Sequence, residues 1–253
     1  MILRRLGNKK KIAQEIIKHF PDHKIYIEPF FGAGGMFFNK PKAKYNIVND
    51  LDSDVFNLFQ VVMNQKEELE KAFYMMPIHS DLLDYWKKNE ETDPIKKALR
   101  FLFLSNLTYL GKHDSLRFGA RNDKHTLTKN IDATFEMLEE VQFNNCDFRR
   151  LFKAINFIDN EQPDCFAYLD PPYLDTVDKY SDSFTKQDSI DLLDIVTELN
   201  IKYAMSEFDH PFILDQAKQR GLNIIIIGER QNLKNRRTEI LVTNYKNIQA
   251  ELF

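Results

Sequence analysis

Residues 25–35 read IYIEPFFGAGG, a short apolar run that ends in a glycine-rich turn. The apolar run predicts a strand, and the apolar residues 36–38 after the glycines predict the start of a helix. A second strand over 45–48 ends near Asp50, and an amphipathic helix over 55–62 follows it. Strands and helices in alternation predict the parallel sheet of an α/β fold.

The middle of the chain, residues 67–141, has a different pattern. Apolar residues recur there at helical spacing, a polar loop over 111–130 interrupts them, and no pattern of a buried strand occurs. This predicts a mostly helical domain inserted into the α/β domain. We therefore divide the chain into an α/β domain formed by 1–66 and 142–253 and an inserted domain formed by 67–141.

The alternation resumes after the inserted segment. Three strands are predicted over 141–144, 165–169 and 202–205, with helices between them. Two final strands, 223–227 and 239–243, are joined by a polar segment without a helix-length pattern. They predict an antiparallel hairpin at the edge of the sheet.

The composition limits the classes of protein to consider. The chain has 253 residues, 43% of them hydrophobic, which is enough for one sizeable core. Its longest aliphatic run, 224–227, is too short to cross a bilayer, and Cys146 and Cys165 lack the spacing of a metal clip or disulfide framework. We expect a cytoplasmic protein without a membrane or metal partner.

The net charge of −3 differs from the basic character of many proteins that bind nucleic acids nonspecifically. Short basic groups do occur, at Arg4 and Arg5, at Lys9, Lys10 and Lys11, and at Lys234, Arg236 and Arg237. An enzyme that binds its substrate transiently can confine positive charge to one cleft, although each group can equally be a solvated face.

The glycine turn lies where open α/β sheets bind ligands, at the carboxyl ends of the strands. Glycines there let the backbone approach a ligand, although a glycine turn after a strand often binds no ligand. Asp50, at the end of the next strand, is placed to accept hydrogen bonds from a ribose diol. It can instead cap the following helix, a role that Asp52 or Ser53 can also fill.

The most specific feature is the sequence Asp170, Pro171, Pro172, Tyr173, directly after the strand at 165–169. The prolines exclude helix and fix a rigid bend at the strand end. An aryl amine such as adenine N6 is a poor nucleophile, because its lone pair is delocalised into the ring. Asp170 and a backbone carbonyl of the proline turn can accept its two N–H bonds and direct the lone pair at a methyl donor, while Tyr173 stacks on the base.

With these residues in order, the chain resembles the Dam-type (D12 class) DNA adenine N6-methyltransferases over almost its full length. The resemblance rests on seven motifs. They are residues 7–9, 28–35, Asp50, 147–148, 170–173, the stretch with Tyr180, Phe184 and Thr185, and 239–245. One such motif can arise by chance, but seven in the same order very rarely do.

The resemblance implies an α/β, Rossmann-like S-adenosylmethionine-dependent methyltransferase fold, whose sheet is mostly parallel with its last strand antiparallel. It implies that the inserted domain at 67–141 recognises a target in double-stranded DNA and that the target adenine turns out of the duplex. S-adenosylmethionine is the implied cofactor. A cognate restriction endonuclease acting on the same site can be a further partner, and the oligomeric state is left open.

The resemblance also implies roles for individual residues. Contacts to S-adenosylmethionine are implied for Lys9, Glu28, Pro29, Phe30, Gly32 and Gly34. Asp50 would bind the ribose of the cofactor, and Asp147 with Phe148 would hold its adenine. Asp170 would lie between the cofactor and the target base, within the catalytic turn that continues through Pro171, Pro172 and Tyr173.

The chain departs from the family pattern in three places. An aromatic residue and a second glycine are usual where this chain has Arg5 and Asn8. The usual Ser-Asn after the fifth strand is Ser206-Glu207, which can alter contacts to cofactor or base. The DNA-binding stretch, usually with Phe-Asn-Gly-Leu-Tyr-Arg, is preserved only in part. Its remnants and the basic residues beside them predict DNA contacts by Asn106, Lys112, Arg117 and Arg121.

Two alternative functions are compatible with parts of this pattern. Related tetrapeptides with Asn in place of Asp serve enzymes that methylate glutamine amides or RNA bases, whereas Asp170 favours adenine in DNA. A DNA-binding relative without catalytic activity could use the inserted domain alone, but binding has no need of an intact turn at 170–173.

Overall fold

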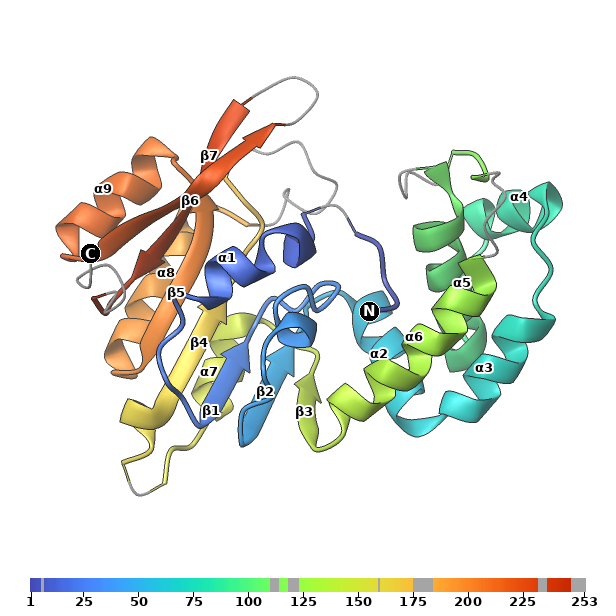
Figure 1. Cartoon of the computed structure of the whole chain (residues 1–253), viewed down its shortest axis with the longest axis horizontal. Helices are drawn as coiled ribbons and strands as arrows, with labels where there is room; N and C mark the ends of the chain where they lie inside the picture. The colour runs from blue at the N-terminus through green and yellow to red at the C-terminus, as the bar shows by residue number, and fades with distance from the viewer. Residues whose placement is uncertain are drawn as a thin grey trace.

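A seven-stranded sheet forms the centre of the protein, shown as a computed structural model in Figure 1. The structure describes residues 1–5, 7–109, 114–117, 123–158, 160–174, 184–231 and 236–246. The strands are β1 (Ile25–Glu28), β2 (Tyr45–Asn49), β3 (Val141–Asn144), β4 (Cys165–Leu169), β5 (Lys202–Phe208), β6 (Asn223–Gln231) and β7 (Arg236–Thr243). Their order is β3-β2-β1-β4-β5-β7-β6; β1 to β5 are parallel, and β7 runs antiparallel to both β5 and β6. The predicted α/β fold with its antiparallel hairpin is confirmed.

The helices cover both faces of this sheet and extend beyond one edge (Figure 1). They are α1 (Ala13–Ile17), α2 (Ser53–Asn64), α3 (Lys66–Met75), α4 (Ser80–Lys88), α5 (Pro94–Leu107), α6 (Asp123–Leu138), α7 (Phe148–Ala154), α8 (Lys186–Glu198) and α9 (Pro211–Gln219). No helix in the described ranges is both long and apolar enough to cross a membrane.

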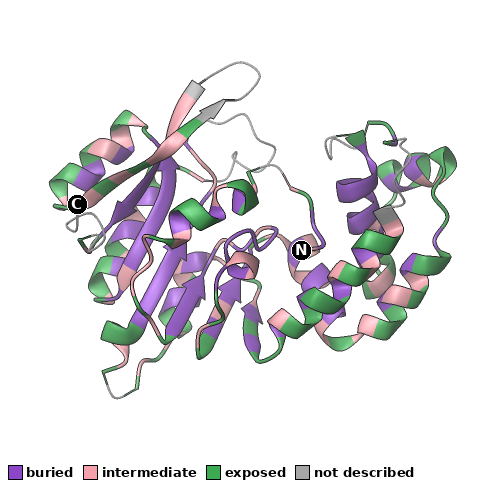
Figure 2. Ribbon diagram, viewed as in Figure 1, coloured by how far each residue is buried: buried purple, intermediate pink, exposed green. Residues whose placement is uncertain are grey.

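Two hydrophobic cores lie on opposite faces of the sheet, because successive side chains of a strand point to opposite faces. Tyr26 of β1 packs in the core that includes residues of α1, α2 and α5, whereas Ile25 and Ile27 pack with residues of α7, α8 and α9. β4 alternates in the same way, with Phe166 on the first side and Ala167 on the second. Figure 2 shows the central strands buried along most of their length.

The strand order brings three acidic residues together at the carboxyl ends of neighbouring strands. β1 pairs with β2 on one side and with β4 on the other, so the chain reverses its direction of progress at β1. Such a switch point is where open α/β sheets bind ligands. Glu28 ends β1, Asp50 follows β2 and Asp170 follows β4, so all three lie at the carboxyl ends of neighbouring strands.

The helix predicted after the glycine turn is wrong. Residues 36–38 contribute only to the 3₁₀ turn η2 (Phe37–Asn39). Lys40 is already extended, with φ −111° and ψ 159°, and Pro41 follows it. Because proline disfavours helical backbone in the residue before it, the chain leaves the turn directly toward β2.

Helices α2 to α6, which lie between β2 and β3 in the sequence, form a packed group that extends beyond the β3 side of the sheet (Figure 1). The group is helical as predicted, but the loop predicted over 111–130 is too long. α6 begins at Asp123, and its residues Leu127 and Ile131, four positions apart, are buried on one side of the helix. Since α2 itself packs against α5 and α6, the domain boundary after residue 66 stays a prediction.

Candidate active site

Asp170 and Lys9 form the central ion pair of the candidate site. Asp170 Oδ1 accepts a hydrogen bond from Lys9 Nζ at 2.7 Å. Lys9 begins the 3₁₀ turn η1 (Lys9–Lys11), whose cap is Asn8, with its side chain accepting from Lys10 N. Only 3% of the Lys9 side chain is exposed, against 20% of the Asp170 side chain. A molecule in solvent can therefore reach the carboxylate but not the ammonium group behind it.

Glu239 of β7 joins the same group of charges. Its Oε1 lies 3.5 Å from Lys9 Nζ and accepts a hydrogen bond from the Tyr173 hydroxyl. Lys9 Nζ is 4.4 Å from the centroid of the Tyr173 ring, which packs edge-on against Phe208 with a centroid distance of 4.8 Å. Burial raises the pKa of Tyr173 well above its usual value, so its hydroxyl keeps its proton. The sequence placed Glu239 in a family motif without assigning it a role.

Glu207 of β5 is a second buried carboxyl group at this end of the sheet. Its Oε1 accepts from Phe208 N at 2.8 Å, and its Oε2 accepts from Leu174 N at 3.2 Å. Burial raises the pKa of Glu207 to about 8, although the two N–H donors and Lys9 act in the opposite direction. Glu207 is therefore mainly uncharged at pH 7, and it fastens the residue after Tyr173 to β5.

The glycine turn is tied to the end of β2 through Asp50. Asp50 Oδ2 accepts from Gly32 N at 2.6 Å, and Oδ1 accepts from Asp52 N at 2.9 Å. Of the candidates for the cap of α2, it is Asp52 that accepts from Asp54 N. Burial raises the pKa of Asp50, with the nearby Arg5 and the two N–H donors acting against the rise.

The two glycines of the predicted cofactor turn have different reasons to be glycine. Both have positive φ, +53° at Gly32 and +69° at Gly34. A Cβ on Gly34 would lie 2.3 Å from a ring carbon of Phe38, so this position needs close packing against the protein. A Cβ on Gly32 would meet no atom within 4 Å among those described, so the backbone there borders open space.

Glu28, the last residue of β1, and Pro29 lead into this turn. Glu28 is 2% exposed and accepts a hydrogen bond from the Tyr26 hydroxyl at 2.8 Å; burial raises its pKa to about 8. The Pro29 carbonyl accepts from Asn49 Nδ2 at 3.0 Å, and the same amide donates to the Cys146 carbonyl at 2.9 Å. Asn49, which the sequence did not single out as a site residue, thus joins the ends of β1, β2 and β3.

Three phenylalanines gather beside the turn. Phe30 lies 5.7 Å from Phe148 and 5.7 Å from Phe184 between ring centroids, and Phe148 and Phe184 are 6.1 Å apart. Asp147 precedes Phe148 and caps α7 by accepting from Arg149 N at 2.9 Å. The predicted residues Phe30, Asp147 and Phe148 are therefore neighbours, with Phe184 as a fourth member.

Comparisons with known proteins identify the family of the chain. The model of the D12 class N6 adenine-specific DNA methyltransferase family matches residues 6–235. The chain belongs to this family. It is 29% identical to a DNA adenine methylase of Haemophilus influenzae over 68% of this chain and 63% of that protein. It is 25% identical to modification methylase StsI of Streptococcus sanguinis over 96% of this chain, but it spans only 42% of that protein. Against type II methyltransferase M1.LlaDCHI of Lactococcus lactis subsp. cremoris, identity is 23% over 95% of this chain and 94% of the other.

The predicted DNA contacts of this family member differ in their accessibility. Asn106 is 3% exposed, and its Nδ2 donates to the carbonyls of Ile2 at 2.9 Å and Leu102 at 3.1 Å. Arg117 is exposed, and its N–H donates to the Leu107 carbonyl at 2.8 Å. Asn106 therefore fixes the N-terminal segment to α5, and Arg117 lies on the surface. Lys112 and Arg121 lie outside the described residues.

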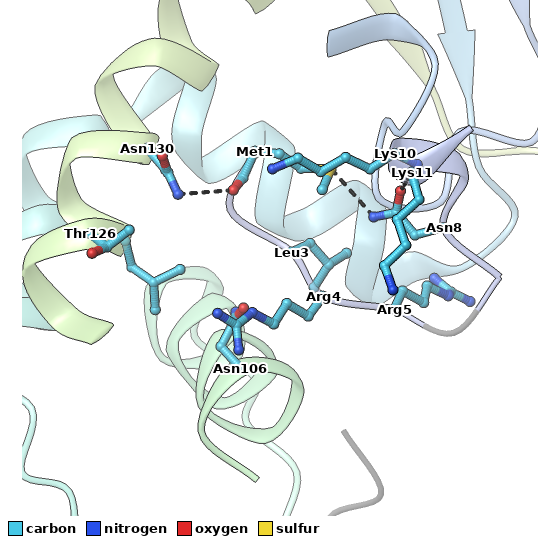
Figure 3. Close-up of a pocket in the computed structure, with 11 residues that line it drawn as sticks. Met1, Leu3, Arg4, Arg5, Asn8, Lys10, Lys11, Asn106, Thr126 and Asn130 are labelled. Atoms are coloured by element: carbon cyan, nitrogen blue, oxygen red, sulfur yellow. Dashed lines mark hydrogen bonds between the residues drawn. The ribbon is translucent and has the colours of Figure 1, made fainter. Parts of the chain in front are cut away.

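A basic pocket, which we define by Arg4, Arg5, Lys10 and Lys11, lies between the N-terminal segment and helices α5 and α6 (Figure 3). Its volume is about 430 Å³. Asn130 of α6 donates to the Met1 carbonyl at 3.1 Å across one side of it. No aspartate or glutamate is among the described residues that line this pocket, in a protein whose net charge is −3. The described residues also contain no group of three or more His, Cys, Asp or Glu side chains suited to hold a metal ion.

Proposed function

We propose that the chain is a site-specific methyltransferase that moves a methyl group from S-adenosylmethionine to N6 of a flipped-out adenine in double-stranded DNA. The observation that carries this proposal is Asp170, partly exposed at the end of β4 and held by Lys9 Nζ at 2.7 Å. Its carboxylate can accept one N–H of the adenine amine, and a carbonyl of the turn at Pro171 and Pro172 can accept the other. The nitrogen then becomes tetrahedral, and its lone pair leaves conjugation with the ring and points at the methyl donor.

The residues at the ends of β1 and β2 fit S-adenosylmethionine. Each oxygen of Asp50 accepts one backbone N–H and can accept a further hydrogen bond, which suits the diol of a ribose. Gly32 borders open space beside this carboxylate. The Phe30, Phe148 and Phe184 rings offer an apolar surface for the cofactor adenine. S-adenosylmethionine, when bound, supplies the electrophilic methyl group.

The residues of the turn at 170–173 then have separate tasks. Asp170 aligns the amine and does not need to be a strong base, because the proton leaves after the methyl group has arrived. Tyr173 stacks on the target base, and its ring is already braced by Phe208. Glu28, at the end of β1, is buried, and its carboxyl group is directed to Tyr26. A target adenine must leave the duplex to reach this edge of the sheet.

The DNA would lie across the basic pocket and the connection between α5 and α6. Arg4, Lys10 and Lys11 line the pocket, and Arg117 is exposed on that connection. Phosphates attract such groups regardless of base sequence, so these residues hold the duplex while the inserted domain at 67–141 selects the site. Direct contacts by Lys112 and Arg121 belong to the same proposal.

One experiment tests this function against its alternatives. The protein is incubated with S-adenosylmethionine labelled in the methyl group and with unmethylated duplex DNA, RNA or a glutamine-containing protein extract. Label in N6-methyladenine of the DNA is the expected result. Label in RNA or protein alone would indicate the other substrates, and DNA binding without transfer to any substrate would indicate a binding protein. Sequencing of methylated DNA from expressing cells then gives the recognised site. A restriction partner would be an endonuclease that cuts unmethylated DNA at this site and leaves the methylated DNA intact.

A further inference from the structure

The buried ammonium group of Lys9 lies between two carboxylates of different character. It donates to Asp170 Oδ1 at 2.7 Å and lies 3.5 Å from Glu239 Oε1. The Glu239 side chain is 1% exposed, whereas that of Asp170 is 20% exposed. One carboxylate can therefore meet a substrate, and the other is enclosed with the lysine.

In the proposed reaction, on which the present inference rests, Asp170 accepts a hydrogen bond from the adenine amine. A carboxylate can accept several hydrogen bonds, but the amine then shares the charge of Asp170 with Lys9, its main partner in the free protein. A buried cation that loses its partner is costly, so Lys9 can leave Asp170 only if another anion receives it. Glu239 is such an anion, and a shift of Nζ by about 0.7 Å would give the usual distance of a charge-assisted hydrogen bond.

We propose that Glu239 is a positioning residue that receives the Lys9 ammonium group when the target amine binds to Asp170. The handover releases the carboxylate for the substrate without leaving a buried cation unpaired. It also links the amine to the base, because the Tyr173 hydroxyl donates to the same oxygen of Glu239. The position of Lys9 and the orientation of the Tyr173 ring are thereby set by one carboxylate.

The hairpin of β6 and β7 fixes Glu239 at this point. Glu239 is paired with Phe208 of β5, the residue against which the Tyr173 ring packs. On the other side, the β6–β7 register shifts between Ile226 and Gly228, and Gly228 is the partner of Glu239. Irregularities of this kind re-aim side chains next to active sites. A slip of one residue in the pairing would turn Glu239 to the opposite face of the sheet.

The test uses four variants of the full chain. Glu239→Gln removes the negative charge but keeps an oxygen that can accept from the Tyr173 hydroxyl. Tyr173→Phe removes only that hydroxyl, and Lys9→Met removes the cation. The matched control is Glu229→Gln, which changes an exposed glutamate of β6 whose strand partner is Thr238, next to Glu239.

The expected result is a fall in kcat of about tenfold or more for Glu239→Gln, with the KM for DNA and the Kd for S-adenosylmethionine within about threefold of wild type. Tyr173→Phe should lose markedly less kcat, and Glu229→Gln should match wild type. A kcat for Glu239→Gln within about twofold of wild type would overturn the proposal. So would an equal loss in Tyr173→Phe, since Glu239 would then act through the tyrosine alone.

Melting temperatures provide a readout that does not depend on methyl transfer. Lys9→Met leaves two carboxylates close together without their cation, so adding Glu239→Gln to it should raise the melting temperature. In the wild-type background the same Glu239→Gln change should lower it. A decrease of equal size in both backgrounds would show that the two residues are not coupled and would overturn the proposal. If wild type methylates no DNA, the proposed function fails, whereas this cycle still decides whether Lys9 and Glu239 act together.

Discussion

The ends of β2 and β4 each place an aspartate at the same edge of the sheet, but the surroundings of the two aspartates are built differently. Asp50 is held by backbone N–H groups, one of them only two residues away and the other in the adjacent glycine turn. Asp170 is held by a lysine side chain 161 residues away, which also approaches a glutamate on β7. Backbone groups thus fix the first aspartate, whereas the second is held by a side chain that already lies near another carboxylate.

This difference predicts that the two aspartates fail in different ways when they are removed. Asp170→Ala should lower kcat by about 10³-fold or more, because the amine then lacks its aligned acceptor. Binding to DNA should stay within a few-fold of wild type, since the proposed phosphate contacts are elsewhere. Single-turnover transfer and DNA binding by fluorescence anisotropy measure the two quantities. Turnover equal to wild type would show that the role assigned to Asp170 is wrong.

Asp50→Ala should show the opposite pattern. The Kd for S-adenosylmethionine should rise by about 10- to 100-fold, because a ribose diol loses an acceptor and the glycine turn loses its tie to β2. At saturating cofactor kcat should change little. Calorimetric titration with the cofactor measures the effect, and Ser53→Ala, an exposed neighbour, is the control. A variant with unchanged cofactor affinity but low kcat would remove the distinction between the two aspartates.

The same contrast explains what the sequence could predict. The glycine turn, Asp50 and the turn at 170–173 are local patterns at strand ends, so strand prediction and spacing were enough to place them at one edge. Glu239 could not be assigned a role in this way. Its role depends on the residue of β5 that it faces, Phe208, and a local sequence pattern does not specify this long-range pairing.

In two other segments, local sequence patterns predict the wrong secondary structure. Met36, Phe37 and Phe38 have the apolar character of a helix, but Pro41 ends the segment after one 3₁₀ turn, before an α-helix can form. In α6 the polar residues hid a helix whose buried side is narrow, with Leu127 and Ile131. Asn106 is 3% exposed and its amide holds the N-terminal segment, so its contact with DNA stays a prediction.

Glu207, on β5, should make the free energy of unfolding depend on pH. Its pKa is raised to about 8 by burial, so between pH 4.5 and 8 the folded protein holds a proton that the unfolded chain releases. Stability from this group is therefore highest below pH 4.5 and falls as the pH rises to 8, by at most about 1.4 kcal/mol per pH unit. Glu207→Gln should flatten that part of the profile in urea unfolding at pH 5.5, 6.5 and 7.5. Glu198→Gln, an exposed change on α8, should leave the slope as it is. Parallel profiles for wild type and Glu207→Gln would mean that burial does not hold the proton.

The smallest effects are expected at the proposed phosphate contacts, because each of them is exposed and is one of several. Arg117→Ala should weaken DNA binding only a few-fold and reduce the slope of log K against log salt by about one. The loss should be similar for specific and unrelated duplexes, since a phosphate contact carries no base information. Lys218→Ala, an exposed cation in the last turn of α9, is the control. An unchanged salt slope would exclude Arg117 as a phosphate contact, and a loss confined to the recognised sequence would make it a base-reading residue. The first result would remove Arg117 from the residues proposed to hold any DNA, and the second would assign it to those that select the site.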